Sequence, residues 1–267
     1  MIALLRRSIA QGRYVLLGVL LLLFAFQLII IAQAAEVERS NAFASVANLM
    51  PGFMQRGLGS RAMLLATFRG TVTFGYFHPV VCILVAVLAM YFATEPAHEV
   101  EAGLVDLELA RAIPRHRLVT RSLLAAIAAL AGATIMMALG TSAGARIFDT
   151  TGMAMPTLEL RSLLLANLFA VGACLTGFAL MMATFARRWS TSFTTVGLVA
   201  VVAYMVDFIA IGWRPMRTIA WLSPFHYYPA LSVVAGDAPT ARNISVLLAA
   251  GAAFVITAYW QFQRRDV

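Results

Sequence analysis

The chain contains no lysine, and all 20 of its basic residues are arginines. A P-loop needs a lysine beside the phosphates of its nucleotide, and a Schiff-base enzyme needs a lysine amine as its nucleophile. The chain therefore cannot build a P-loop ATP site or a Schiff base from its own side chains.

Cysteine and charged residues are also scarce. The two cysteines, Cys82 and Cys174, both fall inside apolar runs, which excludes a disulfide framework and a CxxC site. The four histidines show no metal-ligand spacing. Charged residues make up 12% of the chain, against about 25% in soluble domains. We therefore expect no catalytic, metal or cofactor site in this chain.

Long apolar runs take up most of the sequence. Hydrophobic residues make up 61% of the chain, and six runs reach the roughly 18–22 residues that cross a ~30 Å hydrocarbon core. The sequence therefore predicts one all-α membrane domain over residues 1–267 with six transmembrane helices. The runs are approximately Tyr14–Ala34, Phe77–Thr94, Ser122–Thr141, Leu163–Phe185, Thr194–Trp213 and Ile244–Trp260.

Small residues recur at intervals of four within these runs. Gly140 and Gly144 form one such pair, and Ala173 and Gly177 form another. Small faces let helix backbones approach closely in lipid. We therefore expect a compact bundle, in which packing within the chain is a simpler use of each face than a dimer interface.

The loop arginines indicate the orientation of the spans. An even number of spans places both termini on one side, and the higher density of arginine in the loops of that side favours the cytoplasm. The first run precedes a possible cleavage site at Ala32-Gln33-Ala34. Its apolar core of about 19 residues is longer than the ~7–15 of a signal peptide, so we expect a retained span.

Residues 2–13 form a short amphipathic segment. Ile2, Leu5 and Ile9 lie on one helical face, while Arg6 and Arg7 supply a polar side. Such a helix can lie in the headgroup plane of the membrane. An interfacial helix is therefore one interpretation, and a charged flank that only fixes orientation is the other.

The connection between the second and third runs, residues 95–121, is rich in charge. Val100, Leu104 and Leu107 recur at helical spacing, and acidic residues occupy the other faces. The pattern predicts a short amphipathic helix at the cytoplasmic surface that stops before Pro114. A solvated charged loop is the alternative.

The region around the end of the fifth run carries aromatics, prolines and one acid. Residues 213–243 include several aromatic side chains between prolines, which suits either an interfacial anchor or broken helices that dip into the membrane. Asp207 lies within the run, and an intramembrane acid is a candidate functional residue. Arg214 follows seven residues later and could pair with Asp207 if the helix continues. A structural pair and a gate or substrate role both stay open.

Taken in order, these motifs resemble the ABC-2-type transporter permeases. The segment from Glu99 to Arg115 looks like the cytoplasmic loop of that family, with an acidic pair, a glycine, a leucine-rich turn and a proline followed by arginine. The steps 77–79, 222–228 and 262–266 agree with it, so that the resemblance covers essentially the whole chain. Glu108 and the Ala112-Ile113 pair depart from the usual pattern.

The resemblance implies a multi-pass permease subunit of an ATP-driven exporter in the bacterial cytoplasmic (inner) membrane, which would move a lipid, a drug or a polysaccharide-like substrate. Its expected partners are two ABC ATPase subunits, a second permease copy or homologue, and membrane lipids, but no nucleic acid. ATP and Mg would bind the ATPase and no cofactor would bind this chain, which agrees with the missing lysine. The alternative is a non-transporting membrane scaffold, immunity protein or component of a maturation machine.

The resemblance also implies two sets of site residues. The residues that would couple the permease to the ATPase are Glu99, Glu101, Gly103, Leu104, Leu107, Pro114 and Arg115. A possible gate or substrate pathway would include Asp207, Arg214, Phe225, His226 and Tyr227.

Overall fold

A computed structural model of the chain describes residues 2–40, 67–102, 116–186, 188–235 and 240–264. The described part contains helices and no strands, and six helical segments are long and apolar enough to cross a membrane. The predicted all-α membrane fold with six spans is therefore confirmed. The six spanning segments are α2 (Arg13–Arg39), α5 with α6 (Phe68–Phe77 and Pro79–Ala93), α9 (His116–Ile147), α10 (Leu158–Phe185), α11 (Trp189–Gly212) and α14 (Thr240–Arg264).

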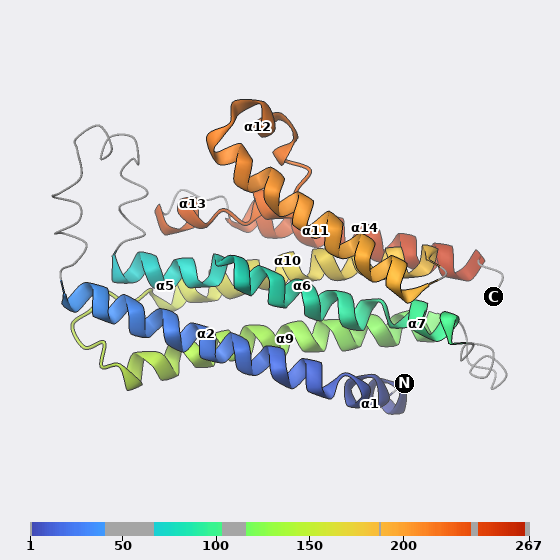
Figure 1. Ribbon diagram of the computed structural model, residues 1–267, viewed down its shortest axis with the longest axis horizontal. Coiled ribbons are helices and arrows are strands. Elements are labelled where there is room, and N and C mark those ends of the chain that lie inside the picture. The colour runs from blue at the N-terminus through green and yellow to red at the C-terminus, as the bar shows by residue number, and fades with distance from the viewer. Residues whose placement is uncertain (1, 41–66, 103–115, 187, 236–239, 265–267) are drawn as a thin grey trace.

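The long helices run side by side along the longest axis of the molecule (Figure 1). Helix α10 lies in the middle, packed against α14, α6 and α9, while α11 lies at the periphery. The two chain ends lie together at one end of the bundle, hereafter the terminal end, next to the short helices α1 (Ile2–Gln11) and α7 (Glu95–Glu101). Three further short elements follow α11: α12 (Arg214–Ala220), the 3₁₀ turn η1 (Pro224–Tyr227) and α13 (Ala230–Ala235).

The second span is built from two helices because of Pro79. A proline disfavours the helical conformation in the residue before it and has no N–H to donate. His78 accordingly adopts an extended conformation, and its Nδ1 accepts a hydrogen bond of 3.3 Å from the backbone N–H of Val80. The Phe77-His78-Pro79 step of the sequence is thus a helix break within a span.

The N-terminal segment forms a helix, α1, as one of its two interpretations predicted; α1 ends at Gln11, and the chain turns into α2 at Gly12. Arg6 and Arg7 are exposed, whereas Ser8 is buried and contacts Glu95 of α7. A Cβ atom at Gly12 would lie 2.8 Å from ring atoms of both Tyr91 and Phe92. Only glycine therefore fits this turn without displacing the rings.

Backbone-to-backbone packing joins α10 to α14 at the predicted small face. A Cβ atom at Gly177 would collide with the backbone oxygen of Gly251, and one at Gly251 would lie 3.1 Å from the oxygen of Ala173. Gly140 meets α2 in the same way, since its Cβ would lie 2.9 Å from the oxygen of Phe24. These small faces serve packing within the chain.

We predict that Gly177→Ala destabilises the protein, because α10 and α14 must separate to admit the methyl group; overpacking of this kind costs about 1–3 kcal/mol. Gly18→Ala is the matched control, since nothing lies within 4 Å of the added atom and alanine is the better helix former by about 1 kcal/mol. Thermal unfolding in detergent measures both. Equal or higher stability of the Gly177 variant would contradict the packing described.

Candidate functional site

Helix α7 lies at the terminal end, between α9 on one side and α11 on the other. It follows α6 directly and begins at Glu95, with Pro96 in its first turn. It ends at Glu101, so the structure describes only the start of the predicted coupling helix. Gly103, Leu104, Leu107, Pro114 and Arg115 lie outside the described residues, and their contact with an ATPase stays a prediction.

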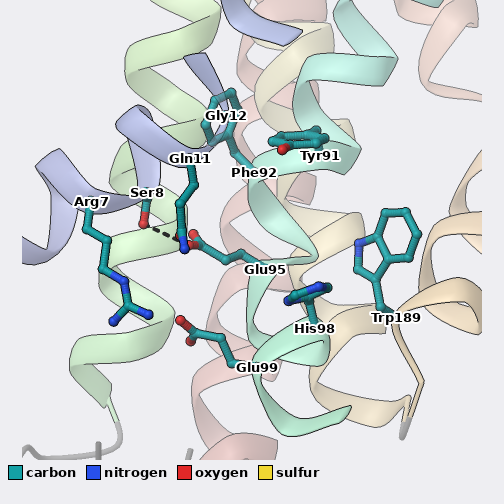
Figure 2. A pocket seen from close by; sticks show the side chains of 10 residues that line it. All are labelled: Arg7, Ser8, Gln11, Gly12, Tyr91, Phe92, Glu95, His98, Glu99 and Trp189. Atoms are coloured by element: carbon teal, nitrogen blue, oxygen red, sulfur yellow. Dashed lines mark hydrogen bonds between the residues drawn. The ribbon is translucent and has the colours of Figure 1, made fainter. Parts of the chain in front are cut away.

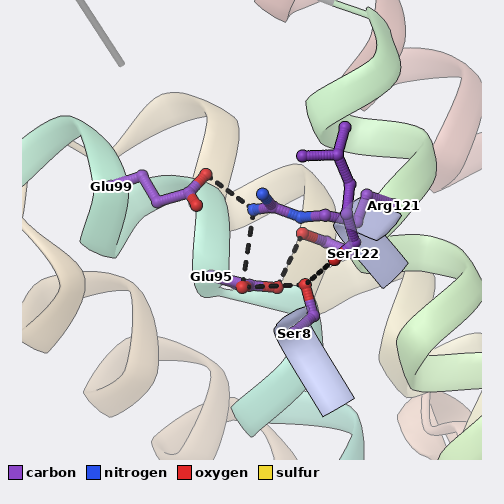
Figure 3. Close-up of polar contacts among 6 residues, drawn as sticks. Ser8, Glu95, Glu99, Arg121 and Ser122 are labelled. Atoms are coloured by element: carbon purple, nitrogen blue, oxygen red, sulfur yellow. Dashed lines mark hydrogen bonds and ion pairs between the residues drawn. The ribbon is translucent and has the colours of Figure 1, made fainter. Parts of the chain in front are cut away.

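A buried arginine joins α7 to α9 (Figure 3). Nη2 of Arg121 lies 2.6 Å from Oε2 of Glu99 and 3.5 Å from Oε1 of Glu95. The Arg121 side chain is fully buried, and those of Glu99 and Glu95 are 5% and 15% exposed. Ser8 donates a hydrogen bond of 2.9 Å to Oε1 of Glu95, and Ser122 donates one of 3.4 Å to Oε2. We call these five residues the Arg121 cluster; it fastens α1, α7 and α9 together.

The ion pairs of the Arg121 cluster contribute more to the position of α7 than to the stability of the protein. Burial raises the pKa of Glu95 above its ordinary value, although Arg121 and the hydrogen bond from Ser8 act in the opposite direction. Taking ions out of water costs about as much as their attraction returns, whereas removing one partner leaves an uncompensated buried charge. The cluster therefore defines where α7 sits more than it adds net stability.

A second set of contacts joins α7 to α11. Oε2 of Glu101 accepts a hydrogen bond of 2.8 Å from the backbone N–H of Trp189, the first residue of α11. The first N–H groups of a helix have no partner within it, and the helix dipole favours a carboxylate there. The Trp189 indole also donates to Oγ1 of Thr94 at 3.0 Å. The first residue of α11 is thus held by hydrogen bonds to Glu101 of α7 and to Thr94, the residue before α7.

A cavity of about 390 Å³ opens beside these contacts (Figure 2). Residues of α1 form one side, and residues at the end of α6, in α7 and at the start of α11 form the other. We call it the terminal cavity. It is lined by Arg7, Ser8, Gln11, Gly12, Tyr91, Phe92, Glu95, His98, Glu99 and Trp189.

At the opposite end of α11, the predicted pair of Asp207 with Arg214 is wrong. The helix ends at Gly212, because Trp213 takes an extended conformation ahead of Pro215, and Arg214 begins α12 as an exposed residue. The seven-residue spacing therefore does not place the two side chains on one helix face. Instead, Oδ1 of Asp207 lies 3.6 Å from Nδ1 of His226.

The turn η1 packs against the half of α11 that lies away from the terminal end. Phe225 is buried and meets the Tyr204 ring edge to face at 5.4 Å, and Ser223 donates a hydrogen bond of 2.8 Å to the oxygen of Ala203. Tyr227 is half-buried and lines an apolar cavity of about 410 Å³ formed by α10, α11, α14 and residues 221–227. Four of the five predicted gate residues thus lie in one region: Asp207, Phe225, His226 and Tyr227.

The region after α11 consists of short pieces, which agrees with the broken-helix interpretation of its sequence. Tyr228 fastens it to the bundle through a hydrogen bond of 2.7 Å to the oxygen of Tyr76. How deep these pieces lie in a membrane, and whether they gate a pathway, stay predictions.

Comparison with known proteins identifies the family. The family model of the ABC-2 family transporter proteins matches residues 5–267. The chain belongs to this family. It is therefore a multi-pass membrane permease component of an ABC transporter, a family that normally works with ABC ATPase partners. No curated protein and no solved structure matches the chain at a significant level.

Sequence reasoning missed most of the polar contacts of the permease. It selected Glu99 and Glu101, but it did not select Glu95, Arg121 or Trp189 as their partners. A signal existed, since Glu95 and Glu99 are four residues apart and so share a helix face, and an arginine at the border of a span calls for an acidic partner. Among the described residues, no group of three or more His, Cys, Asp or Glu could hold a metal.

We predict that Arg121→Met destabilises the permease by about 3–5 kcal/mol, because it leaves the buried Glu99 carboxylate without its counter-ion. Arg117→Met is the matched control: Arg117 lies on the same helix but is exposed, and its loss should change stability by about 0.5 kcal/mol or less. Unfolding in detergent by heat or denaturant gives both values. Equal stability of the two variants would show that the Arg121 cluster does not hold α7.

Proposed function

We propose that this permease is the membrane subunit of an ATP-driven exporter in the bacterial cytoplasmic membrane. It would pair with a second copy or homologue and with two ABC ATPase subunits that bind ATP and Mg. The terminal end would face the cytoplasm. The observation that carries the proposal is the position of α7, which binds α9 through Arg121 on one side and α11 through Trp189 on the other.

Helix α7 would pass a displacement from an ATPase to α11. It leads directly into residues 103–115, the segment that the sequence predicts to contact the ATPase. The Arg121 cluster would hold the base of α7 on α1 and α9, while Glu101 and Thr94 would carry the start of α11 along with it. A short helix with fixed contacts at both sides transmits such motion, whereas a solvated loop would absorb it.

Helix α11 is suited to be the moving span. It is the least buried of the six spanning segments, so that fewer packed side chains resist its displacement. Its outer half contacts η1 through Asp207, Ala203 and Tyr204. Displacement of α11 would therefore reach Phe225, His226 and Tyr227, the proposed gate.

The apolar cavity beside Tyr227 is suited to bind a substrate that has an apolar part. Its wall includes Phe178, Trp221, Leu222 and Phe254 from several elements. A lipid or an amphipathic drug fits such a lining, and a polysaccharide-like substrate is the third class that the family resemblance implies. The competing function, a non-transporting scaffold, needs neither an ATPase nor movement of α11.

We predict that the tagged permease, purified from its own membranes, retains an ABC ATPase whose hydrolysis rate depends on the permease. Leu104→Asp should release the ATPase, because it places a charge in the predicted contact. Glu101→Gln should retain it but lower permease-dependent hydrolysis, because the carboxylate that binds the start of α11 is lost. Glu159→Gln, an exposed acid at the other end of the bundle, is the control. Absence of any bound ATPase would favour the scaffold.

Movement of α11 can be measured directly in the same complex. Spin labels at the exposed positions 36 and 208 report the distance from α2 to the half of α11 that lies away from the terminal end, and labels at 36 and 158 report the distance from α2 to α10. We expect trapped ATP to change the first distance but not the second, and Glu101→Gln to abolish the change. An unchanged first distance in the wild type would refute α11 as the moving span.

A further inference from the structure

We propose that the terminal cavity binds a phosphoethanolamine group, the zwitterionic headgroup of an aminophospholipid. The proposal concerns a lipid bound to the side of the permease and does not depend on what the permease transports. It rests on the charges, the rings and the position of the cavity.

The α7 side of the cavity is acidic. Glu95 and Glu99 both line it, and within the Arg121 cluster two carboxylates face one guanidinium. Figure 2 shows both carboxylates directed toward α1, with Glu95 beside Ser8 and Glu99 toward Arg7. This side of the cavity therefore suits a positively charged group.

Aromatic rings line the remaining wall. Tyr91 and Phe92 lie edge to face with ring centres 5.3 Å apart, and the rings of His98 and Trp189 are likewise edge to face at 6.3 Å. The faces of aromatic rings attract ammonium groups, by about 0.5–2 kcal/mol according to exposure. An ammonium group in the terminal cavity would thus lie between carboxylates on one side and aromatic rings on the other.

The α1 side of the cavity carries a positive charge. Arg7 lines the cavity from the exposed side of α1, and a guanidinium matches the geometry of a phosphate. Glu95 and Glu99 together balance Arg121 and Arg7, so a zwitterion enters without adding net charge. An anionic headgroup without an ammonium group would instead face the two carboxylates.

The position of the cavity favours a lipid over a soluble molecule. It lies where α1 turns into α2 at Gly12 and where α6 ends at Ala93, which is the level of headgroups for spanning helices. The adjoining turns of α2 expose Tyr14, Leu17 and Leu21. Acyl chains can follow this apolar surface below a headgroup held in the cavity.

The test is lipid binding by the purified, delipidated permease, measured by native mass spectrometry with equal amounts of phosphatidylethanolamine and phosphatidylglycerol. We expect a preference for phosphatidylethanolamine of about three- to tenfold, the equivalent of one ammonium contact. Glu95→Gln should abolish the preference, because it removes the charge but keeps the volume. Gln11→Trp should also abolish the preference, because it fills the cavity from an exposed position of α1 and so excludes the headgroup.

Matched controls and a soluble probe complete the experiment. Glu159→Gln and Gln263→Trp make the same substitutions at exposed positions outside the cavity and should retain the preference. If Glu95→Gln unfolds, Gln11→Trp still decides the outcome. If free O-phosphoethanolamine binds and phosphatidylethanolamine does not, the cavity binds a soluble phosphoethanolamine compound instead of a lipid. No preference in the wild type, or an unchanged preference in both cavity variants, would overturn the proposal.

Discussion

The structure depends on one buried guanidinium at the end of a membrane span. Arg121 is fully buried, and its charge is compatible with that position only because Glu99 and Glu95 approach it from α7. This requirement draws α7 back onto the bundle, and Ser8 brings α1 into the same cluster. Two short helices, α1 and α7, are thereby held in one arrangement against the α9 span.

In the remainder of the permease, some helices are closely packed and one is packed over little of its surface. Helices α10 and α14 meet backbone to backbone at Gly177 and Gly251, which leaves no room for relative movement without separation. Helix α11 has the least buried surface of the spans. The fixed contacts of α11 with α7 and with η1 at its two ends therefore matter more than its packing along the length.

The same residues at the terminal end serve more than one contact. Glu95 belongs to the Arg121 cluster and also lines the terminal cavity, and Trp189 both begins α11 and forms part of the cavity wall. A group bound in the cavity would touch α1, α7 and α11 together. The lipid environment and the proposed movement of α11 would then act on one set of side chains, because the cavity lies between α1 and the start of α11.

Hydropathy and the spacing of small residues alone determine the number of spans and the close approach at Gly177, because each depends on residues that are neighbours along the chain. The second span predicted from the sequence begins at Phe77, whereas the structure extends this span back to Phe68, across the break at Pro79. The pattern of charges in residues 95–121 indicates a surface helix, but it does not indicate that Glu99 faces inward. Only the tertiary structure decides that Arg121 is its partner and that Asp207 meets His226 instead of Arg214. Those pairs join separate helices, and Asp207 misses Arg214 because the chain leaves the helix at Trp213. Spacing within a sequence predicts partners only as far as the helix continues.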